Sequence, residues 1–214
     1  MASTFPGAID SFTDPLSGSA LNSPSHSAQH ADLNDAAEKI ETYMGLIKVI
    51  PTSVTNGTLS ATGTITVGSG VASITVNGAF SSLYDVYLIV LNGIDTPAAG
   101  NNITMDYDDG TSLYNWANMY MNYNSTTIVG ARAQSQTSSV IGYSGNNDDT
   151  NISVTVRGPN LAKRTTFSIQ ENTDTYSVVG GGGHDALTQH TKFKIGTSGV
   201  SFTGGTIVVY GYRK

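Results

Sequence analysis

Helical periodicity occurs once in this chain, and that single occurrence most constrains what the chain can fold into. Between Gln29 and Met44, apolar side chains recur at spacings of three and four, and the positions between them are mostly polar. Gly45 follows where helices commonly end, and Pro51 prevents any continuation. We therefore expect one short helix with a coiled-coil-like pattern, and a remainder that folds without helices.

The apolar stripe of this helix predicts association between copies of the chain. A lone helix of about 18 residues is marginal in water unless its apolar stripe is buried. Two or three copies would bury a narrow stripe directly, whereas the alternative is that the helix packs on its own chain's β domain. The stripe, called the seam below, consists of Leu33, Ala37, Ile40, Met44 and Ile47.

Two histidines extend the seam toward the N-terminus. His26 and His30 are four residues apart, so in a parallel assembly they would form rings near the axis that could hold a metal ion, an anion or water. The simpler interpretation is a polar end of the coil without chemistry. We adopt the simpler interpretation, and expect no metal site and no cofactor.

Residues 1–24 predict an extended arm. Prolines and glycines are spread along this segment, so no helix runs through it. A disordered tail usually carries fewer large apolar residues than this segment does. We interpret it as an arm that orders when it attaches to a partner, and the alternative is a floppy leader with incidental apolar residues. The residues expected to make the attachment are Phe5, Ile9, Phe12 and Leu16.

From Thr52 onward, short strands separated by tight turns are the recurring pattern. Thr- and Val-rich segments, among them Thr58–Val67, which we expect to be one strand, are flanked by turn signals such as Asn56-Gly57 and Asn77-Gly78. The segment from Leu83 to Leu91 is almost entirely apolar, which indicates a buried central strand. The pattern predicts a mainly β fold with an antiparallel, jelly-roll-like β-sandwich. The expected organisation is an arm over 1–24, the helix and its exit over 25–50, and the sandwich over 51–214.

Charge and cysteine content exclude several classes of function. Only 12% of the residues are charged and the formal net charge is −6, which argues against nucleic acid because phosphates require a patch of Lys and Arg. The chain has no cysteine, which excludes disulfides, thiolate chemistry and cysteine zinc sites. No apolar run is long enough to predict a membrane span.

The acidic motif near residue 108 does not match a calcium loop. Asp106, Asp108 and Asp109 offer carboxylates, but counting from Asp106 places Gly110 fifth and Ala117 twelfth, where an EF-hand requires Gly sixth and Glu twelfth. A hairpin turn is the better interpretation.

The glycine run and the histidines after it do not form a known catalytic motif. Gly180–Gly183 lacks the Lys and Ser/Thr of a phosphate-binding loop, so we interpret it as a mobile loop or as a crossing of chains at a crowded axis. His184 and His190 could join a serine in a triad, but no serine lies in a G-x-S-x-G elbow. We expect no enzyme activity and no catalytic residue.

The segment Leu113–Tyr123 predicts a strand with one aromatic face. Aromatic rings stack on the flat C–H faces of sugars, and an amide can add hydrogen bonds, so this face is our candidate for glycan contact. The alternative is that the single Trp lies in the core, as is common in sandwiches. The candidate contacts are Tyr114, Trp116, Asn118 and Tyr120.

Polar loops on the sandwich are the other candidates for recognition, because binding residues concentrate on loops carried by a rigid scaffold. The four candidate loops are Asp95–Asn102, Asp108–Ser112, Gly145–Asn151 and Gly180–Asp185.

Two parts of the chain resemble known proteins. The stretches Phe80–Asp109 and Phe202–Arg213 resemble the C-terminal β-sandwich domains of tailed-bacteriophage fibre and appendage proteins. The end of the leader with the helix, LNSPSHSAQHADLNDAAEKIETYMG, resembles the N-terminal attachment segments of phage virion proteins. The resemblance implies a homotrimer exposed on the virion, attached to other virion proteins. It implies either a tail or neck fibre that recognises a host-surface glycan, or a capsid decoration protein that binds no receptor.

Overall fold

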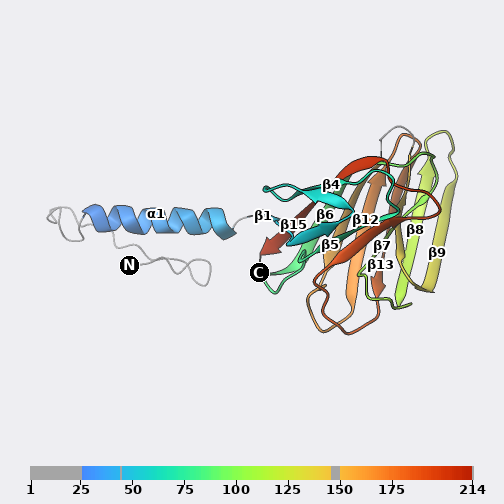
Figure 1. Ribbon diagram of the computed structural model, residues 1–214. Coiled ribbons are helices and arrows are strands. Elements are labelled where there is room, and N and C mark those ends of the chain that lie inside the picture. Colours follow the sequence, from blue (N-terminus) through green and yellow to red (C-terminus); the bar gives the residue numbers. More distant parts are fainter. Residues whose placement is uncertain (1–25, 44, 146–149, 214) are drawn as a thin grey trace. The chain divides into compact units, whose positions relative to one another are not determined.

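The computed structural model describes residues 26–43, 45–145 and 150–213, and it confirms a mainly β fold with antiparallel sheets (Figure 1). The chain divides into two units, Met1–Gly45 and Leu46–Lys214. In the first unit, helix α1 spans His26–Tyr43, so the predicted helix is confirmed and begins three residues earlier than its periodicity indicated. Within the described residues, no helix combines the length and apolar character needed to cross a membrane.

The second unit is a β-sandwich made of one large and one small sheet. The strands of the large sheet are β1 (Leu46–Val49), β3 (Gly57–Leu59), β4 (Thr64–Val67), β6 (Tyr84–Asp95), β8 (Tyr114–Asn122), β9 (Ile128–Gln136), β11 (Thr150–Arg157), β12 (Thr165–Asn172), β13 (Tyr176–His184) and β15 (Gly204–Arg213). They follow the order β3-β4-β15-β6-β11-β12-β13-β8-β9, and β1 also pairs with β15. Strand β9 is therefore an edge strand.

The small sheet has five strands. They are β2 (Ser53–Thr55), β5 (Ser73–Asn77), β7 (Asn102–Asp106), β10 (Ser139–Tyr143) and β14 (Phe193–Thr197). Their order is β10-β7-β14-β5-β2, and each described pairing in both sheets is antiparallel.

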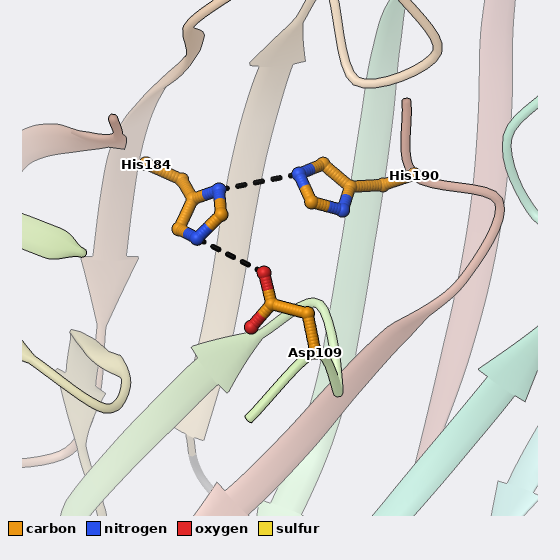
Figure 2. Close-up of side chains that lie close together, drawn as sticks. All are labelled: Asp109, His184 and His190. Atoms are coloured by element: carbon orange, nitrogen blue, oxygen red, sulfur yellow. Dashed lines mark hydrogen bonds and ion pairs between the residues drawn. The ribbon is translucent and has the colours of Figure 1, made fainter. Parts of the chain in front are cut away.

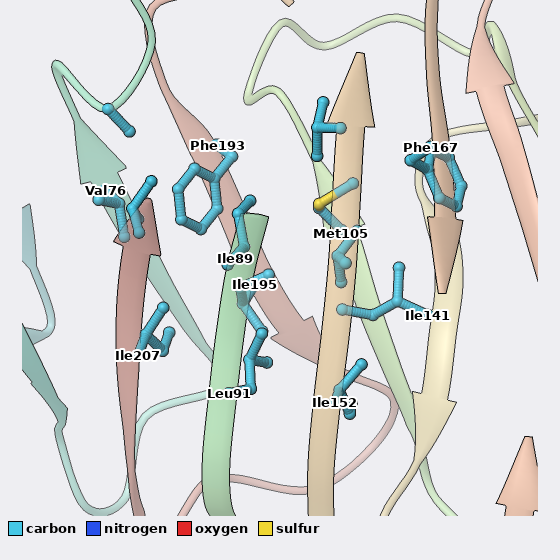
Figure 3. Close-up of a cluster of buried hydrophobic side chains, with 14 of the residues drawn as sticks. Val76, Ile89, Leu91, Met105, Ile141, Ile152, Phe167, Phe193, Ile195 and Ile207 are labelled. Atoms are coloured by element: carbon cyan, nitrogen blue, oxygen red, sulfur yellow. The ribbon is translucent and has the colours of Figure 1, made fainter. Parts of the chain in front are cut away.

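The core lies between the two sheets, where alternate side chains of each strand meet (Figure 3). Central strand β6 contributes Tyr87, Ile89 and Leu91, which are all fully buried. Ile195 of β14 and Met105 of β7 are buried in the same cluster from the small sheet. Burying one large apolar side chain contributes about 1.5–3 kcal/mol, so a cluster of this size drives the closure of the sandwich.

Three local predictions were wrong. Ile47, placed on the helical seam, lies instead in β1 opposite Gly211, so the sandwich begins before residue 51. The segment Thr58–Val67, expected as one strand, is divided into β3 and β4 by a turn in which Gly63 has a φ of 79°. The glycine run Gly180–Gly183, expected as a loop, lies inside β13.

Close packing explains why glycine occupies that part of β13. A Cβ at Gly180 would meet the side-chain oxygen of Asn118, and a Cβ at Gly182 would lie 2.7 Å from the Phe167 ring. These neighbours are on the two strands that flank β13, so the strand fits between them only without side chains.

Candidate functional site

Strand β8 confirms the predicted alternation but not the predicted exposure. Tyr114 and Asn118 point inward and are only 1% and 2% exposed, so neither can contact a glycan. The Asn118 amide donates a hydrogen bond to the Val140 carbonyl oxygen, 3.0 Å away in β10. Tyr114 and Asn118 therefore belong to the interior, because the aromatic face of β8 is the one that faces the small sheet.

Trp116 and Tyr120 are half-buried on the same inner face, and both pack against the core cluster. The Tyr120 ring lies 5.4 Å from the Tyr143 ring and 6.0 Å from the Tyr176 ring, so it belongs to an aromatic cluster at that end of the sandwich. Tyr120 is thus held by neighbouring rings rather than presented to solvent.

The opposite, outer face of the large sheet carries an open groove. Strand pairing places Gly181 and Arg132 on either side of Ala117, so two small residues form the floor beside an arginine. The groove measures about 310 Å³, at the lower end of the ~300–1,000 Å³ typical of ligand pockets. The residues that line this outer groove are Asn115, Trp116, Ala117, Arg132, Ala133, Gln134, Arg164, Gly181 and Gly182.

Two arginines, Arg132 and Arg164, line the outer groove, although the whole chain carries a formal charge of −6. Arg164 pairs with Asp185 at 2.8 Å, and Asn115 also donates to Asp185 at 2.7 Å. Arg157 donates to the Ser168 hydroxyl, which belongs to the residue opposite Gly181. Within the described part of the chain, neither Arg132 nor Arg157 has an acidic partner. The face can therefore receive a ligand with negative charge.

A cluster of three ionisable side chains lies where loops of the two sheets meet. It consists of Asp109, His184 and His190 (Figure 2). Asp109 is in the β7–β8 loop, His184 ends β13, and His190 is in the β13–β14 loop. His184 Nε2 is 3.0 Å from Asp109 Oδ2, and His184 Nδ1 is 3.2 Å from His190 Nε2. Together the three side chains form a continuous hydrogen-bonded series from the carboxylate to the second imidazole.

Burial and hydrogen bonding determine the protonation of these three side chains. Burial lowers the pKa of both His184 and His190, so the two imidazoles are neutral at neutral pH. Burial tends to raise the pKa of Asp109, but hydrogen bonds from Thr111 and the nearby His184 outweigh it, so the pKa of Asp109 is lowered. An ionised carboxylate only accepts, so His184 donates from Nε2, which faces Asp109 Oδ2 at 3.0 Å and the Thr111 hydroxyl at 2.8 Å. His184 Nδ1 then accepts from His190 Nε2.

Tyrosines enclose the cluster. The Tyr107 ring stacks on the His190 ring at 4.3 Å, and the Tyr114 ring lies 4.3 Å from the His184 ring. The Tyr114 hydroxyl accepts a hydrogen bond from the Tyr107 amide at 2.7 Å and donates to Asp109 Oδ1 at 3.1 Å. The Tyr107 hydroxyl is buried and has no hydrogen-bond partner among the described residues.

The neighbouring aspartates have lysine partners. Lys192 lies 2.6 Å from Asp108, and Lys194 lies 3.2 Å from Asp106, in agreement with a structural turn rather than an EF-hand. Asp109, His184 and His190 are each recognisable in the sequence, but no local pattern joins them. The available signal was two histidines six residues apart together with an acidic turn, and only the sheet topology unites them.

The remaining predicted residues fall on the N-terminal unit or outside the described residues. On α1, Leu33 and Ile40 are 62% and 45% exposed in the single chain, and Ala37 is exposed as well. Met44 and the attachment residues Phe5, Ile9, Phe12 and Leu16 lie outside the described residues. The His26 side chain also does, while His30 is exposed.

No protein-family model and no curated protein significantly matches this chain.

Proposed function

We propose that this chain is a non-enzymatic structural protein of a tailed-phage particle, in which the outer groove binds an acidic glycan on the host surface. In this proposal the protein is a homotrimeric tail or neck fibre, and residues 1–24 attach it to other virion proteins. The resemblance of Phe80–Asp109 and Phe202–Arg213 to phage appendage sandwiches supports the class of particle. The outer groove supports the binding.

The observation that carries glycan binding is the pairing of a small-residue floor with arginines on an otherwise acidic chain. Gly181 and Ala117 leave room for a sugar ring on the sheet, and the exposed amide of Gln134 can hydrogen-bond its hydroxyls. A guanidinium such as that of Arg132 fits a carboxylate with two parallel hydrogen bonds. The groove therefore favours a sugar that carries a carboxylate over a neutral one.

Glycan-array binding with Arg132→Gln tests this assignment. We expect the wild-type chain to bind carboxylated glycans selectively, and the variant to lose at least about tenfold in affinity, because a charged hydrogen bond contributes about 1.5–3 kcal/mol. Lys192→Gln is the matched control, since it removes the same charge outside the groove. Equal binding by both variants, or no preference for acidic glycans, contradicts the proposal.

An exposed apolar patch supports the alternative function, a capsid decoration protein. The outer face beyond the groove carries an apolar patch, in which Met119 lies opposite Val179 and Met121 lies opposite Ile128. All four side chains are between 41% and 66% exposed. Such a patch suits contact with another protein. A decoration protein would bind assembled capsids through this patch, so Met121→Asp would abolish capsid binding and Arg132→Gln would not.

A further inference from the structure

We propose that His184 and His190 bind a divalent transition-metal ion of the zinc class, with Asp109 as the carboxylate that orients His184. This inference is independent of the glycan proposal, because it uses other residues. It assigns the metal ion to the junction between the two sheets.

The geometry of the two imidazoles fits a shared ion. Zinc lies about 2.0–2.1 Å from a histidine nitrogen, so two nitrogens in one tetrahedral site are about 3.3 Å apart. His184 Nδ1 and His190 Nε2 are 3.2 Å apart. Both imidazoles are neutral, which is the form that binds a metal. The ion would replace only the proton on His190 Nε2, which moves to Nδ1 of the same ring.

Asp109 stands in the position that orients a metal-bound histidine. His184 Nε2 faces the Asp109 carboxylate at 3.0 Å and the Thr111 hydroxyl, which itself donates to Asp109, at 2.8 Å. Donation from Nε2 to this pair leaves the opposite nitrogen, Nδ1, as a fixed lone pair. Carboxylate–histidine–metal arrangements of this kind hold the ring and increase its basicity. The carboxylate is itself held by Thr111 and by the Tyr114 hydroxyl. Its negative charge also compensates part of the charge of a buried cation.

The buried Tyr107 hydroxyl gives a second, independent indication. Tyr107 packs against both imidazoles, and its hydroxyl has no hydrogen-bond partner in the described part of the chain. Buried polar atoms without partners are uncommon in folded proteins and often mark a bound water or ion. With two histidine ligands, two waters would complete a tetrahedral site, and one of them would supply a partner for this hydroxyl. The Asp109 side chain keeps 20% of its surface exposed, whereas that of His184 has none, so an ion would enter from the side of Asp109.

A bound ion would join parts of both sheets. His184 ends a strand of the large sheet, whereas Asp109 follows β7 and His190 precedes β14 in the small sheet. Because an ion that binds only the folded state stabilises it, metal should raise the melting temperature of the sandwich.

Calorimetric titration of the chelator-treated full chain with Zn²⁺ tests the proposal, with Co²⁺ absorption as a second readout of nitrogen ligation. We expect one ion per chain and a higher melting temperature with metal. His190→Gln should weaken binding by at least about 100-fold. Asp109→Asn, which removes the orienting charge, should weaken it by about 10–100-fold and retain the Co²⁺ spectrum. The melting temperature of each metal-free variant shows whether it folds.

The control is a double variant of the only other histidines in the chain, His26→Gln with His30→Gln. These are four residues apart on α1 and could bind zinc adventitiously. Unchanged binding in this double variant supports the proposal. Binding that disappears with the helical pair and persists in His190→Gln overturns it, as does the absence of binding by the wild-type chain. Asp109→Asn behaving like His190→Gln would overturn the orienting role and make Asp109 a ligand.

Discussion

Glu171 is the clearest case in which one residue should control stability. Its side chain is fully buried in β12, and burial raises its pKa to about 8 despite a hydrogen bond from the Tyr143 amide at 2.8 Å. Its other carboxyl oxygen has no hydrogen-bond partner among the described residues. The folded chain therefore keeps Glu171 protonated at neutral pH, because a buried carboxylate without a cation is costly.

This residue predicts a stability that falls as pH rises. The pKa is about 8 in the folded chain against an ordinary 4.5, so between these values the folded state binds more protons than the unfolded state. The free energy of unfolding should decrease across this window, by up to about 1.4 kcal/mol per pH unit, and level off above pH 8. Glu171→Gln should flatten the slope and stabilise the protein at alkaline pH. Urea unfolding at about pH 5 and about pH 9 measures both effects, and equal slopes in the two proteins would contradict the prediction.

For the individual residues of β8, the sequence predicted that side chains alternate between two faces but not which of the two faces is buried. Alternation separates Tyr114 and Asn118 from Met119 and Met121, and both sets contain large side chains. The choice depends on the small sheet, since strand β10 receives the hydrogen bond from Asn118. That information is not local to β8. Because alternate side chains point to opposite faces, burying Tyr114 and Asn118 leaves Met119 and Met121 exposed.

Among the elements, β13 shows how neighbours override intrinsic preference. Glycine is unfavourable in strands, so the run Gly180–Gly183 predicted a loop. Pairing with β8 and β12 on both sides fixes it as a strand. The strand pattern elsewhere was predictable because Thr- and Val-rich segments have strong turn signals at both ends. Strands such as β1 and β2 are too short to show this pattern, so the sequence did not predict them.

Gly182→Ala should therefore destabilise the sandwich. The added Cβ would meet the Asn115 carbonyl oxygen and lie 2.7 Å from the Phe167 ring, and a backbone atom cannot move aside as a flexible side chain can. We expect a loss of about 1–3 kcal/mol in the free energy of unfolding, the usual cost of overpacking. Gly130→Ala on edge strand β9 is the matched control, since a Cβ there would have no neighbour within 4 Å. Urea denaturation of both variants measures the difference, and equal stabilities would contradict the packing argument.

For the whole molecule, topology decides which residues form a site. Asp109, His184 and His190 come from separate loops, and they meet because β13 pairs with β8 and places His184 opposite Tyr114. Each residue was identifiable from the sequence, but the strand register that brings them together was not. The outer groove arises in the same way, from residues of β8, β9 and β13 that are separated in the sequence. Single elements were predictable from local patterns, whereas both candidate sites required the pairing of strands.

The exposed apolar residues of α1 predict that several chains assemble. In the single chain Leu33 and Ile40 remain 62% and 45% exposed on α1, which leaves an apolar stripe open to water. Association of three chains in parallel would cover that stripe, and we expect a homotrimer at micromolar concentration. Ile40→Asp should dissociate it, because three carboxylates would meet in one apolar layer. The control is Asn34→Asp, which adds the same charge at an exposed polar position of α1 outside the seam. Light scattering measures the mass of each protein. A monomeric wild type would refute the trimer, and a trimer that survives Ile40→Asp would place the contact in the β-sandwich instead.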